Sequence, residues 1–369
     1  MIDPSALEAQ RKRAAAMTLE EVKEQMNRNG ELIPELKECL SYSSKEPEKR
    51  FFVSTDNDFT RKARTLQAIR RWQSGAACGF IEKNGIKYFH PNLAADGLEA
   101  NRNFLHREIY EYARQRVRNK KPYETINEER LFCNFLSSQP MAFNLFVPLM
   151  VITQCEEGQT RLARVISSLL DKGNRLSISR ITEVGVEFIP DYYRECLNDK
   201  TAMDACFRYE RADGGKGIIA IETKYTDILG KNQASDPTRG IQTATQRAGI
   251  CELFTDEGKE KIASGEIKLS QVYRNFLLTE CVRLHEQLDD SLSIVLAPKE
   301  NKGNEEEEKQ LTSILKSEYK YKFQSVQLED FVKKLIREFP NEPIFPCFHH
   351  RYLDFSRAER LLPPKIKKL

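Results

Sequence analysis

The chain has 369 residues, enough for one large domain or two domains with a substantial core. Its 58 basic and 55 acidic residues leave a net charge of only +3, which excludes a polycationic nucleic-acid binder but allows a local basic surface. No apolar run approaches the roughly 20 residues that span a bilayer, and the N-terminus lacks the apolar core of a secretory signal. We therefore expect a cytoplasmic protein with no membrane partner.

The cysteines, histidines and glycines exclude several further classes of site. Nine cysteines are scattered along the chain, and no pair has the CxxC spacing of a zinc or redox motif. Five histidines leave little material for Ser-His chemistry. The phosphate-binding loops GxxxxGK[ST] and GxGxxG are absent, so nucleotide binding by those loops is not expected.

The N-terminal third predicts helices around one hairpin. Residues 5–40 predict polar helices whose thin apolar stripe fits loose packing or a protein partner. Residues 58–75 predict a basic helix, for which a solvated face is favoured over a surface that meets phosphates. Residues 80–89 predict a hairpin around an Asn-Gly turn.

A long helix is predicted near residues 100–117, and it leads into a basic cluster. This cluster is the densest outside the C-terminal tail. Its members Arg114, Arg118 and Lys120 are candidate contacts to nucleic-acid phosphates.

Residues 127–149 mix polar side chains with Phe and Leu. We predict a helix that begins at an Asn127 N-cap and is broken by Pro140. The polar residues favour a buried, hydrogen-bonded structural network. The alternative is that this segment holds a site carboxylate, Glu128 or Glu129.

The second half alternates between helical and strand patterns. Three predicted strands follow one another, and the apolar run at 291–297 predicts a fourth after two helices. The predicted segments are a helix at 158–172, strands at 176–189, 204–211 and 216–225, helices at 239–254 and 269–288, the strand at 291–297, and a helix at 328–339. This order predicts an α/β fold in which helices flank a mixed sheet.

Within this order, the strand at residues 216–225 ends in an unusual way. Four apolar residues run without a break and are followed by Glu222 and Lys224. Because side chains alternate along a strand, Ala220, Glu222 and Lys224 should share one face. Two charges at the end of a buried strand are costly unless they are paired or used.

The turn before this strand sets where Asp204 lies. Residues 212–215 form an Asp-Gly type of turn signal. A loop with an odd number of residues would place Asp204 opposite Glu222 or opposite Lys224, on the same face. A two-residue loop would instead send Asp204 to the other face, so the prediction can fail.

Asp204, Glu222 and Lys224 are the residue types that metal-dependent phosphodiester hydrolysis requires. Carboxylate oxygens suit Mg²⁺, or Mn²⁺, which neutralises the scissile phosphate and activates a water molecule. The backbone carbonyl of Thr223 is a further candidate ligand. Lys224 would stay protonated beside the carboxylates and stabilise the charge on phosphorus. The alternative is a surface salt bridge at a strand end.

The arrangement resembles the PD-(D/E)XK nuclease superfamily, which has the fold of restriction endonucleases. It resembles more closely an uncharacterised bacterial family of restriction-endonuclease-like proteins. The resemblance covers roughly residues 60–300. It is carried by the segments NFLSSQPMAFNLF (134–146), DKTAMDA (199–205), IAIETKY (219–225) and QVYR (271–274). Met203 stands where the superfamily name has proline, which is a minor departure.

The resemblance implies a nuclease with Asp204, Glu222 and Lys224 as its catalytic core. A further acidic residue usually joins such sites, and Glu129 is the candidate, with Glu128 and Glu187 as alternatives. Related nucleases place a polar pair from the following helix near the site. By position, these are Gln271 in a catalytic role and Arg274 in nucleic-acid binding. Ordinary packing of a helix explains the same pair equally well.

The sequence therefore predicts a nuclease-like domain at 58–300, between a helical extension at 1–57 and a helical C-terminal segment at 301–369 that packs on the core. The expected activity is Mg²⁺-dependent cleavage of DNA, with RNA left open, in bacterial restriction or anti-phage defence. A second copy of the chain or a defence-system protein is the expected protein partner. The alternative is a non-catalytic nucleic-acid-binding or partner-dependent module, and a third hypothesis is an inert interaction protein.

Overall fold

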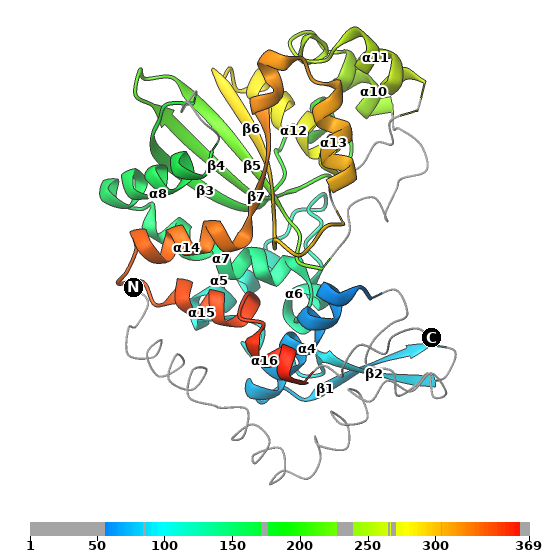
Figure 1. Ribbon diagram of the computed structural model, residues 1–369, viewed down its shortest axis with the longest axis vertical. Helices are drawn as coiled ribbons and strands as arrows, with labels where there is room; N and C mark the ends of the chain where they lie inside the picture. Colours follow the sequence, from blue (N-terminus) through cyan, green and yellow to red (C-terminus); the bar gives the residue numbers. More distant parts are fainter. Residues whose placement is uncertain are drawn as a thin grey trace. The chain divides into compact units, whose positions relative to one another are not determined.

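The computed structural model describes residues 56–83, 86–170, 176–226, 239–264, 266, 271–303 and 305–361 (Figure 1). Two predictions lie outside these residues: the N-terminal helices at 5–40 and the Asn-Gly turn at 84–85.

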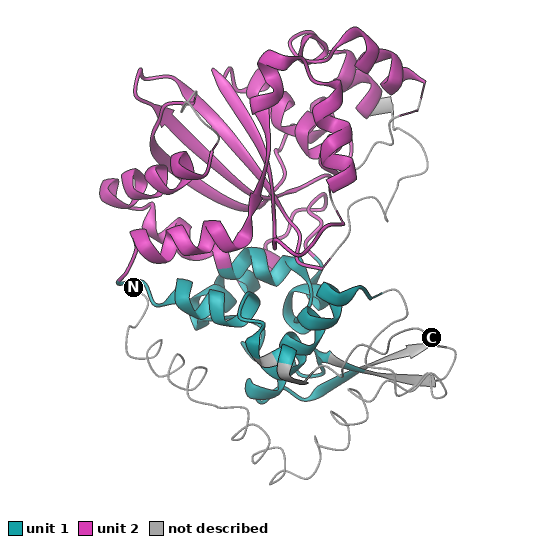
Figure 2. Cartoon of the chain, in the orientation of Figure 1, with its two compact units in different colours: residues 1–114, 127–144, 341–369 teal, residues 115–126, 145–340 magenta. Residues whose placement is uncertain are grey.

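Two compact units divide the chain (Figure 2). The first takes in the described parts of residues 1–114, 127–144 and 341–369, and the second takes in those of 115–126 and 145–340. Two of the four boundaries fall inside helices, one in α5 (Arg107–Arg118) and one in α7 (Ser138–Ile152). The expected domain limits at residues 57 and 300 stay a prediction, because contact density and function need not divide a chain at the same residues.

The first unit combines a hairpin with short helices. Besides the first parts of α5 and α7, its elements are α4 (Asp58–Gln73), β1 (Cys78–Lys83), β2 (Ile86–Ala94), α6 (Glu128–Cys133), α15 (Ile344–Tyr352) and α16 (Ser356–Leu361). The antiparallel pair β1–β2 confirms the predicted hairpin. The helix expected from residue 100 begins only at Arg107, because residues 100–106 take an irregular path.

Asn127 caps α6 as predicted, because its side chain accepts a hydrogen bond from the Arg130 N–H. Pro140 does not end this helix. The chain leaves helical geometry at Asn134, and Pro140 lies in the first turn of α7, where its missing N–H has no cost. The sequence therefore placed the break correctly within a few residues but assigned it to the wrong residue.

The polar side chains of this segment form the structural network that we favoured. Asn144 is 1% exposed, accepts from the Leu105 N–H at 2.8 Å and donates to the Asn103 carbonyl at 3.0 Å. The buried Arg351 donates to the same carbonyl at 2.7 Å. These contacts satisfy buried polar groups and give the first unit a hydrogen-bonded interior.

The second unit is built on a five-stranded sheet of order β3-β4-β5-β6-β7. Its strands are β3 (Ile178–Phe188), β4 (Met203–Arg211), β5 (Lys216–Thr223), β6 (Asp290–Ala297) and β7 (Phe323–Gln327). The β3–β4 and β4–β5 pairs are antiparallel, whereas β5–β6 and β6–β7 are parallel. β7 corrects the expectation for residues 301–369, which supply the fifth strand as well as helices.

The helices of this unit connect the strands and cover the sheet (Figure 1). Besides the last parts of α5 and α7, they are α8 (Glu156–Leu169), α9 (Tyr193–Cys196), α10 (Arg239–Gln246), α11 (Asp256–Ala263), α12 (Gln271–His285), α13 (Glu305–Ile314) and α14 (Leu328–Glu338), with two short 3-10 turns, η2 (Cys251–Leu253) and η3 (Ser317–Lys322). The mixed sheet flanked by helices confirms the predicted α/β, restriction-endonuclease-like core.

The two faces of the sheet have different partners. Ile218 and Ala220 belong to a core cluster with Val272 and Phe276 of α12. On the opposite face, the Phe207 ring packs against the Phe146 ring of α7, with centroids 5.8 Å apart. Alternation along β5 therefore turns Ile218, Ala220 and Glu222 toward α12.

The β4–β5 hairpin has the odd register on which the site depends. Ala205 pairs with Ile221, and Glu210 pairs with Lys216, so the same register places Asp204 opposite Glu222. The loop contains three residues, because the Arg211 N–H donates to the Gly215 carbonyl. Gly214 has φ +86°, a left-handed conformation that glycine adopts without strain. The predicted hairpin is therefore confirmed, with Asp204 and Glu222 as partners.

Candidate active site

The candidate site lies where β4 begins and β5 ends. Asp204 is the second residue of β4, Glu222 is the penultimate residue of β5, and Lys224 follows directly after β5. Glu222 is 3% exposed and Lys224 is 7% exposed. They form an ion pair, but a buried one, so the alternative of a surface salt bridge is wrong in its location.

Glu222 has one ion-pair partner and one hydrogen-bond donor. The Nζ atom of Lys224 is 2.5 Å from Oε1, and the Nδ2 atom of Asn275 is 2.5 Å from Oε2. Lys224 does not reach Oε1 with hydrogen-bond geometry, so Oε1 is a buried acceptor with no hydrogen-bond donor among the described residues. Burial, and then the neighbouring Asp204 charge, raise the pKa of Glu222 from 4.5 to about 7, against the opposing effect of Lys224.

Asp204 is half-buried, and its carboxylate is bound by Thr223. The backbone N–H and the side-chain hydroxyl of Thr223 both donate to Oδ2, each at 2.7 Å. Thr223 thus ties the start of β4 to the end of β5. The sequence drew attention only to the carbonyl of Thr223. Its role as a metal ligand stays a prediction.

Lys224 is held by the first residue of α12. Its Nζ atom donates to Oε1 of Gln271 at 2.8 Å, and Gln271 is exposed. The structure therefore brings Gln271 to the predicted triad. Its position at the start of α12 lets the side chain reach the end of β5, since α12 packs on β5 and β6.

Asn275 is the site residue that the sequence did not reveal. It lies one helical turn after Gln271, is 5% exposed and contacts Glu222 directly. Its signal was the spacing of four residues from Gln271, which places both side chains on the same face of a helix. By position in the sequence, Gln271 was instead paired with Arg274, which lies three residues later in the helix.

Arg274 points to another partner. Its Nε and Nη2 atoms donate to the Thr201 hydroxyl at 3.2 and 3.1 Å, and Nε is 3.4 Å from Oδ2 of Asp199. These contacts fix the segment that leads into β4 and hence into Asp204. Phosphate binding by Arg274, which is about one-quarter exposed, stays a prediction.

Glu187 is one of the two alternatives to Glu129 as the further acidic residue of the site. The Val186–Ala205 and Phe188–Met203 pairs bracket it, so it lies across from Asp204 on β3. It is 5% exposed and has φ +51°, an unusual backbone conformation for a residue with a side chain. The Arg116 guanidinium binds the carbonyls of Val186 and Glu187 at 2.6 and 3.2 Å.

The other predicted residues lie on exposed surfaces. Glu129 is in the first turn of α6, in the first unit. Arg114, at the end of the first unit's part of α5, lies over the Tyr110 ring at 5.5 Å. Arg118 and Lys120 belong to the second unit, where Lys120 donates to the Ile126 carbonyl at 3.1 Å. Nucleic-acid binding by the three basic residues, and the role of Glu129, stay predictions.

A family model described as the PD-(D/E)XK nuclease superfamily matches residues 54–354 of the chain. The chain belongs to the PD-(D/E)XK nuclease superfamily. This membership places it among the nucleases, hydrolases that act on nucleic acid and generally use divalent metals. No curated protein and no solved structure matches the chain.

The residues that the superfamily would use for a divalent cation fit that role chemically. Glu222 offers a buried oxygen whose close partner is the Lys224 ammonium and which accepts no hydrogen bond among the described residues, and burial and the Asp204 charge raise the pKa of Glu222. Asp204 supplies a second hard oxygen donor. Among the described residues, no three Asp, Glu, His or Cys side chains gather closely enough to hold an ion. A two-carboxylate site suits Mg²⁺, which retains several waters in protein sites.

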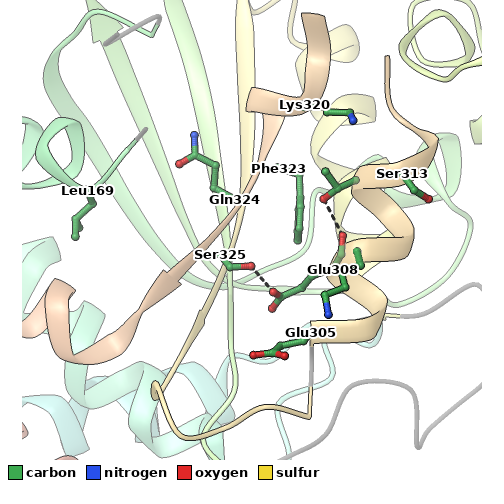
Figure 3. A pocket seen from close by; sticks show the side chains of 10 residues that line it. Leu169, Glu305, Glu308, Ser313, Lys320, Phe323, Gln324 and Ser325 are labelled. Carbon is green, nitrogen blue, oxygen red and sulfur yellow. Dashed lines mark hydrogen bonds between the residues drawn. The ribbon is translucent and has the colours of Figure 1, made fainter. Parts of the chain in front are cut away.

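One pocket of the second unit is not lined by Asp204, Glu222 or Lys224. This pocket of about 540 Å³ lies between α13 and the edge strand β7, where Ser325 donates to Glu308 at 2.5 Å (Figure 3). Beside Glu222, a small cavity of about 10 Å³ is lined in part by Asn275 and Ser293. The candidate site is therefore identified by its charges and contacts rather than by pocket size.

Two further results concern the whole described chain. All eight cysteines that the structure describes are free thiols, in agreement with the absence of a disulfide framework. Within the same residues, no helix has the length and apolar character needed to cross a membrane.

Proposed function

We propose that this superfamily member is a divalent-metal-dependent endonuclease that hydrolyses phosphodiester bonds of DNA. The observation that carries the proposal is the meeting of Asp204, Glu222 and Lys224 at the β4–β5 strand ends, with a buried Glu222 oxygen that lacks a hydrogen-bond donor. The resemblance to restriction endonucleases supports DNA over RNA.

In the proposed mechanism, Asp204, Glu222 and the Thr223 carbonyl hold Mg²⁺ or Mn²⁺. The bound cation would neutralise charge on the scissile phosphate and make a water molecule more acidic. Asp204 is oriented for this role by the two donors of Thr223, and Glu222 by Asn275.

Lys224 supplies the positive charge at the reacting phosphate. Gln271 and Glu222 hold its ammonium group. As a water oxygen bonds to phosphorus and the phosphorus–ester oxygen bond breaks, Lys224 stabilises the growing negative charge. The departing oxygen takes up a proton, leaving one hydroxyl end and one phosphate monoester.

The experiment uses supercoiled plasmid DNA, on which a single internal cut changes the topology. The wild-type chain should nick or linearise the plasmid with Mg²⁺ or Mn²⁺ and leave it intact in EDTA. Asp204→Asn, Glu222→Gln and Lys224→Met should each abolish cleavage. Asp213→Asn, at the opposite end of the same hairpin, is the matched control and should cut normally.

The outcomes separate the remaining hypotheses. Metal-dependent cleavage that persists unchanged in all three variants would refute the proposed site. DNA that is bound with a steep salt dependence but stays intact under all metals would favour the non-catalytic module. A single-stranded or structured RNA offered in parallel decides which polymer is preferred.

The basic residues of the proposed DNA surface have their own test. Arg118→Ala or Lys120→Ala should weaken DNA binding irrespective of sequence and reduce the salt slope by about 1 if each contacts one phosphate. Arg164→Ala is a control, because its guanidinium is paired with Glu338 on a different helix pair. An unchanged salt dependence of DNA affinity would mean that Arg118 and Lys120 do not contact DNA phosphates.

A role in restriction or anti-phage defence follows from the same resemblance. Cells that express the wild-type chain should lower the plating efficiency of sensitive phages, and cells that express Asp204→Asn should not. Equal plating would leave the nuclease proposal intact and remove the defence role. The expected cytoplasmic location and protein partner stay predictions.

A further inference from the structure

Asn275 is the only uncharged side chain that the structure places in hydrogen-bond contact with the Glu222 carboxylate among the described residues. Its Nδ2 atom donates to Oε2 at 2.5 Å, and both residues are buried, at 5% and 3% exposure. Asn275 therefore contributes a donor where the carboxylate cannot be hydrated from bulk water.

The two oxygens of Glu222 have different environments because of this contact. Oε2 is bound by Asn275, whereas Oε1 faces Lys224 without a proper hydrogen bond. The amide thus restrains the rotation of the carboxylate plane and leaves Oε1 as the oxygen beside the Lys224 ammonium. A carboxylate that ligates a metal commonly depends on such a neighbour for its orientation.

The side-chain amide of Asn275 hydrogen-bonds to Glu222 and, among the described residues, to no second polar group. Its Oδ1 atom is buried and has no hydrogen-bond donor among the residues that the structure describes. A side chain that served only packing would leave such an acceptor unsatisfied for no gain, because a buried polar group without a partner is unfavourable. The contact with Glu222 is the feature that accounts for an asparagine here.

The backbone that carries Asn275 is firmly held. The flanking residues Val272 and Phe276 are buried in the core cluster between α12 and the sheet. The Thr279 hydroxyl donates to the Asn275 carbonyl at 2.6 Å, and Ser293 of β6 donates to that hydroxyl at 3.0 Å. α12 thereby places the amide against β5 as part of a rigid element, as an accurately positioned site requires.

We propose that Asn275 is a positioning residue that orients Glu222 to bind the divalent cation through Oε1. This inference rests on the proposed function, since it assigns the support of a proposed metal ligand. Asn275 itself contacts neither the cation nor the substrate. It acts through the plane of the Glu222 carboxylate.

The test is direct titration of the full chain with Mn²⁺ by isothermal calorimetry, without DNA. Asn275→Leu keeps the volume and removes the donor, and it should weaken Mn²⁺ binding 10- to 100-fold, the usual effect of removing a neighbour that orients a metal ligand. Asn275→Ala leaves room for a water that can donate to Oε2, so its loss should be smaller, about 3- to 10-fold. Unfolding midpoints without metal are measured for both.

Thr245→Val is the matched control, because it removes a buried hydrogen bond to Tyr273 of α12 without touching Asn275 or Glu222. It should shift the unfolding midpoint but leave Mn²⁺ affinity within 2-fold of wild type. A purely structural role for Asn275 predicts the same pattern for its variants, with altered midpoints, unaltered affinity and a larger effect of Ala than of Leu.

The outcomes distinguish this inference from the proposed function. A wild-type chain that binds no Mn²⁺ overturns the proposed metal site itself. A wild-type chain that binds Mn²⁺, with Asn275→Leu binding equally well, overturns only the role of Asn275. If Asn275→Leu does not fold, the Ala variant decides: wild-type affinity refutes the role, and weakened affinity with a normal midpoint supports it.

Discussion

Two clusters of the second unit contain the same charged types, two carboxylates and one lysine, yet differ in how completely their oxygens are hydrogen-bonded. The candidate site has Asp204, Glu222 and Lys224. The second, here named the Lys322 cluster, comprises Glu280, Asp290, Ser291 and Lys322. α12 serves both, because it carries Asn275 to Glu222 and supplies Glu280 itself.

The Lys322 cluster is saturated. The Nζ atom of Lys322 is 2.9 Å from Asp290 Oδ1, 2.9 Å from Ser291 Oγ and 3.2 Å from Glu280 Oε1. Arg283 donates to the other Glu280 oxygen at 2.6 Å. No atom of this cluster is among the buried polar atoms without a partner in the described part of the chain.

The candidate site is unsaturated by comparison, with Glu222 Oε1 lacking a hydrogen bond and the pKa of Glu222 raised to about 7. The two clusters also occupy opposite ends of the sheet, since Asp290 pairs with Gly217 at the start of β5, and Glu222 pairs with Val295 near its end. Residue types alone therefore do not identify a functional site. The two clusters differ in that Glu222 Oε1 has the Lys224 ammonium beside it but no hydrogen bond among the described residues.

The sharpest way to break this comparison is to remove each lysine. Lys322→Met leaves two buried carboxylates without their cation and should lower the free energy of unfolding by about 3–5 kcal/mol, with nuclease activity per folded molecule unchanged. Lys224→Met should cost about 1 kcal/mol or less, because Glu222 can take up a proton near pH 7, while cleavage falls at least about 10²-fold. Urea unfolding and plasmid cleavage measure both quantities. Equal stability losses in the two variants would contradict the distinction.

A second test uses pH. The unfolded chain ionises Glu222 near pH 4.5, whereas the folded chain keeps the proton to about pH 7, so the folded state binds more protons between these values. The contribution of Glu222 to stability should therefore fall by about 3 kcal/mol as the pH rises from 4.5 to 7. Glu222→Gln should lack this decrease.

The measurement is urea unfolding of wild type and Glu222→Gln at several pH values in EDTA. Glu183→Gln, an exposed substitution on β3, is the control and should follow the wild-type curve. Parallel curves for wild type and Glu222→Gln would mean that Glu222 has an ordinary carboxyl pKa, and the candidate site would lose its electrostatic signature.

A third test adds the cation. At a Mn²⁺ concentration 100 times its dissociation constant, the wild-type chain should gain about 2.7 kcal/mol of stability by mass action. Asp204→Asn should lose most of this gain, whereas Lys322→Met, although less stable at the outset, should gain as much as wild type. Unfolding with and without Mn²⁺ gives the difference. If Mn²⁺ no longer stabilised Lys322→Met, the cation would bind at the Lys322 cluster instead of at the candidate site.

The smallest effects are expected when a residue that hydrogen-bonds to either lysine is replaced. Ser291→Ala removes a donor to Glu280 and should cost about 1–2 kcal/mol of stability with cleavage unaltered. Gln271→Ala, at an exposed position, should leave stability within about 0.5 kcal/mol and slow cleavage about 5- to 10-fold. Single-turnover cleavage and urea unfolding check the pair. A stability loss in Gln271→Ala would assign that residue to packing.

Much of this second unit could be predicted from local patterns. The apolar run before Glu222, the charged residues at its end and the Asp-Gly turn predicted a hairpin in which Asp204 and Glu222 share a face, and the register confirmed it. The β7 strand was missed because FQSVQ is short and only its first residue is buried, which leaves a weak apolar signal.

Two contacts of the site could not be predicted. Thr223 binds Asp204 through its hydroxyl as well as its N–H, and this depends on the strand ending at that residue. Asn275 could be placed on the face of Gln271 by helical spacing, but not against Glu222, since the packing of α12 on β5 arises from apolar residues far apart in the chain.

The sequence by itself determined the hairpin and the three charged residues at the strand ends and limited the register to a few alternatives, because strand alternation and turn signals are local properties. The tertiary structure alone decided which carboxylate oxygens accept hydrogen bonds. Lys322 and Lys224 both lie beside buried carboxylates, but Ser291 and Arg283 complete one cluster, whereas Asn275 and Gln271 leave Glu222 Oε1 without a hydrogen bond. Saturation depends on side chains from separate elements, so no local pattern could reveal it.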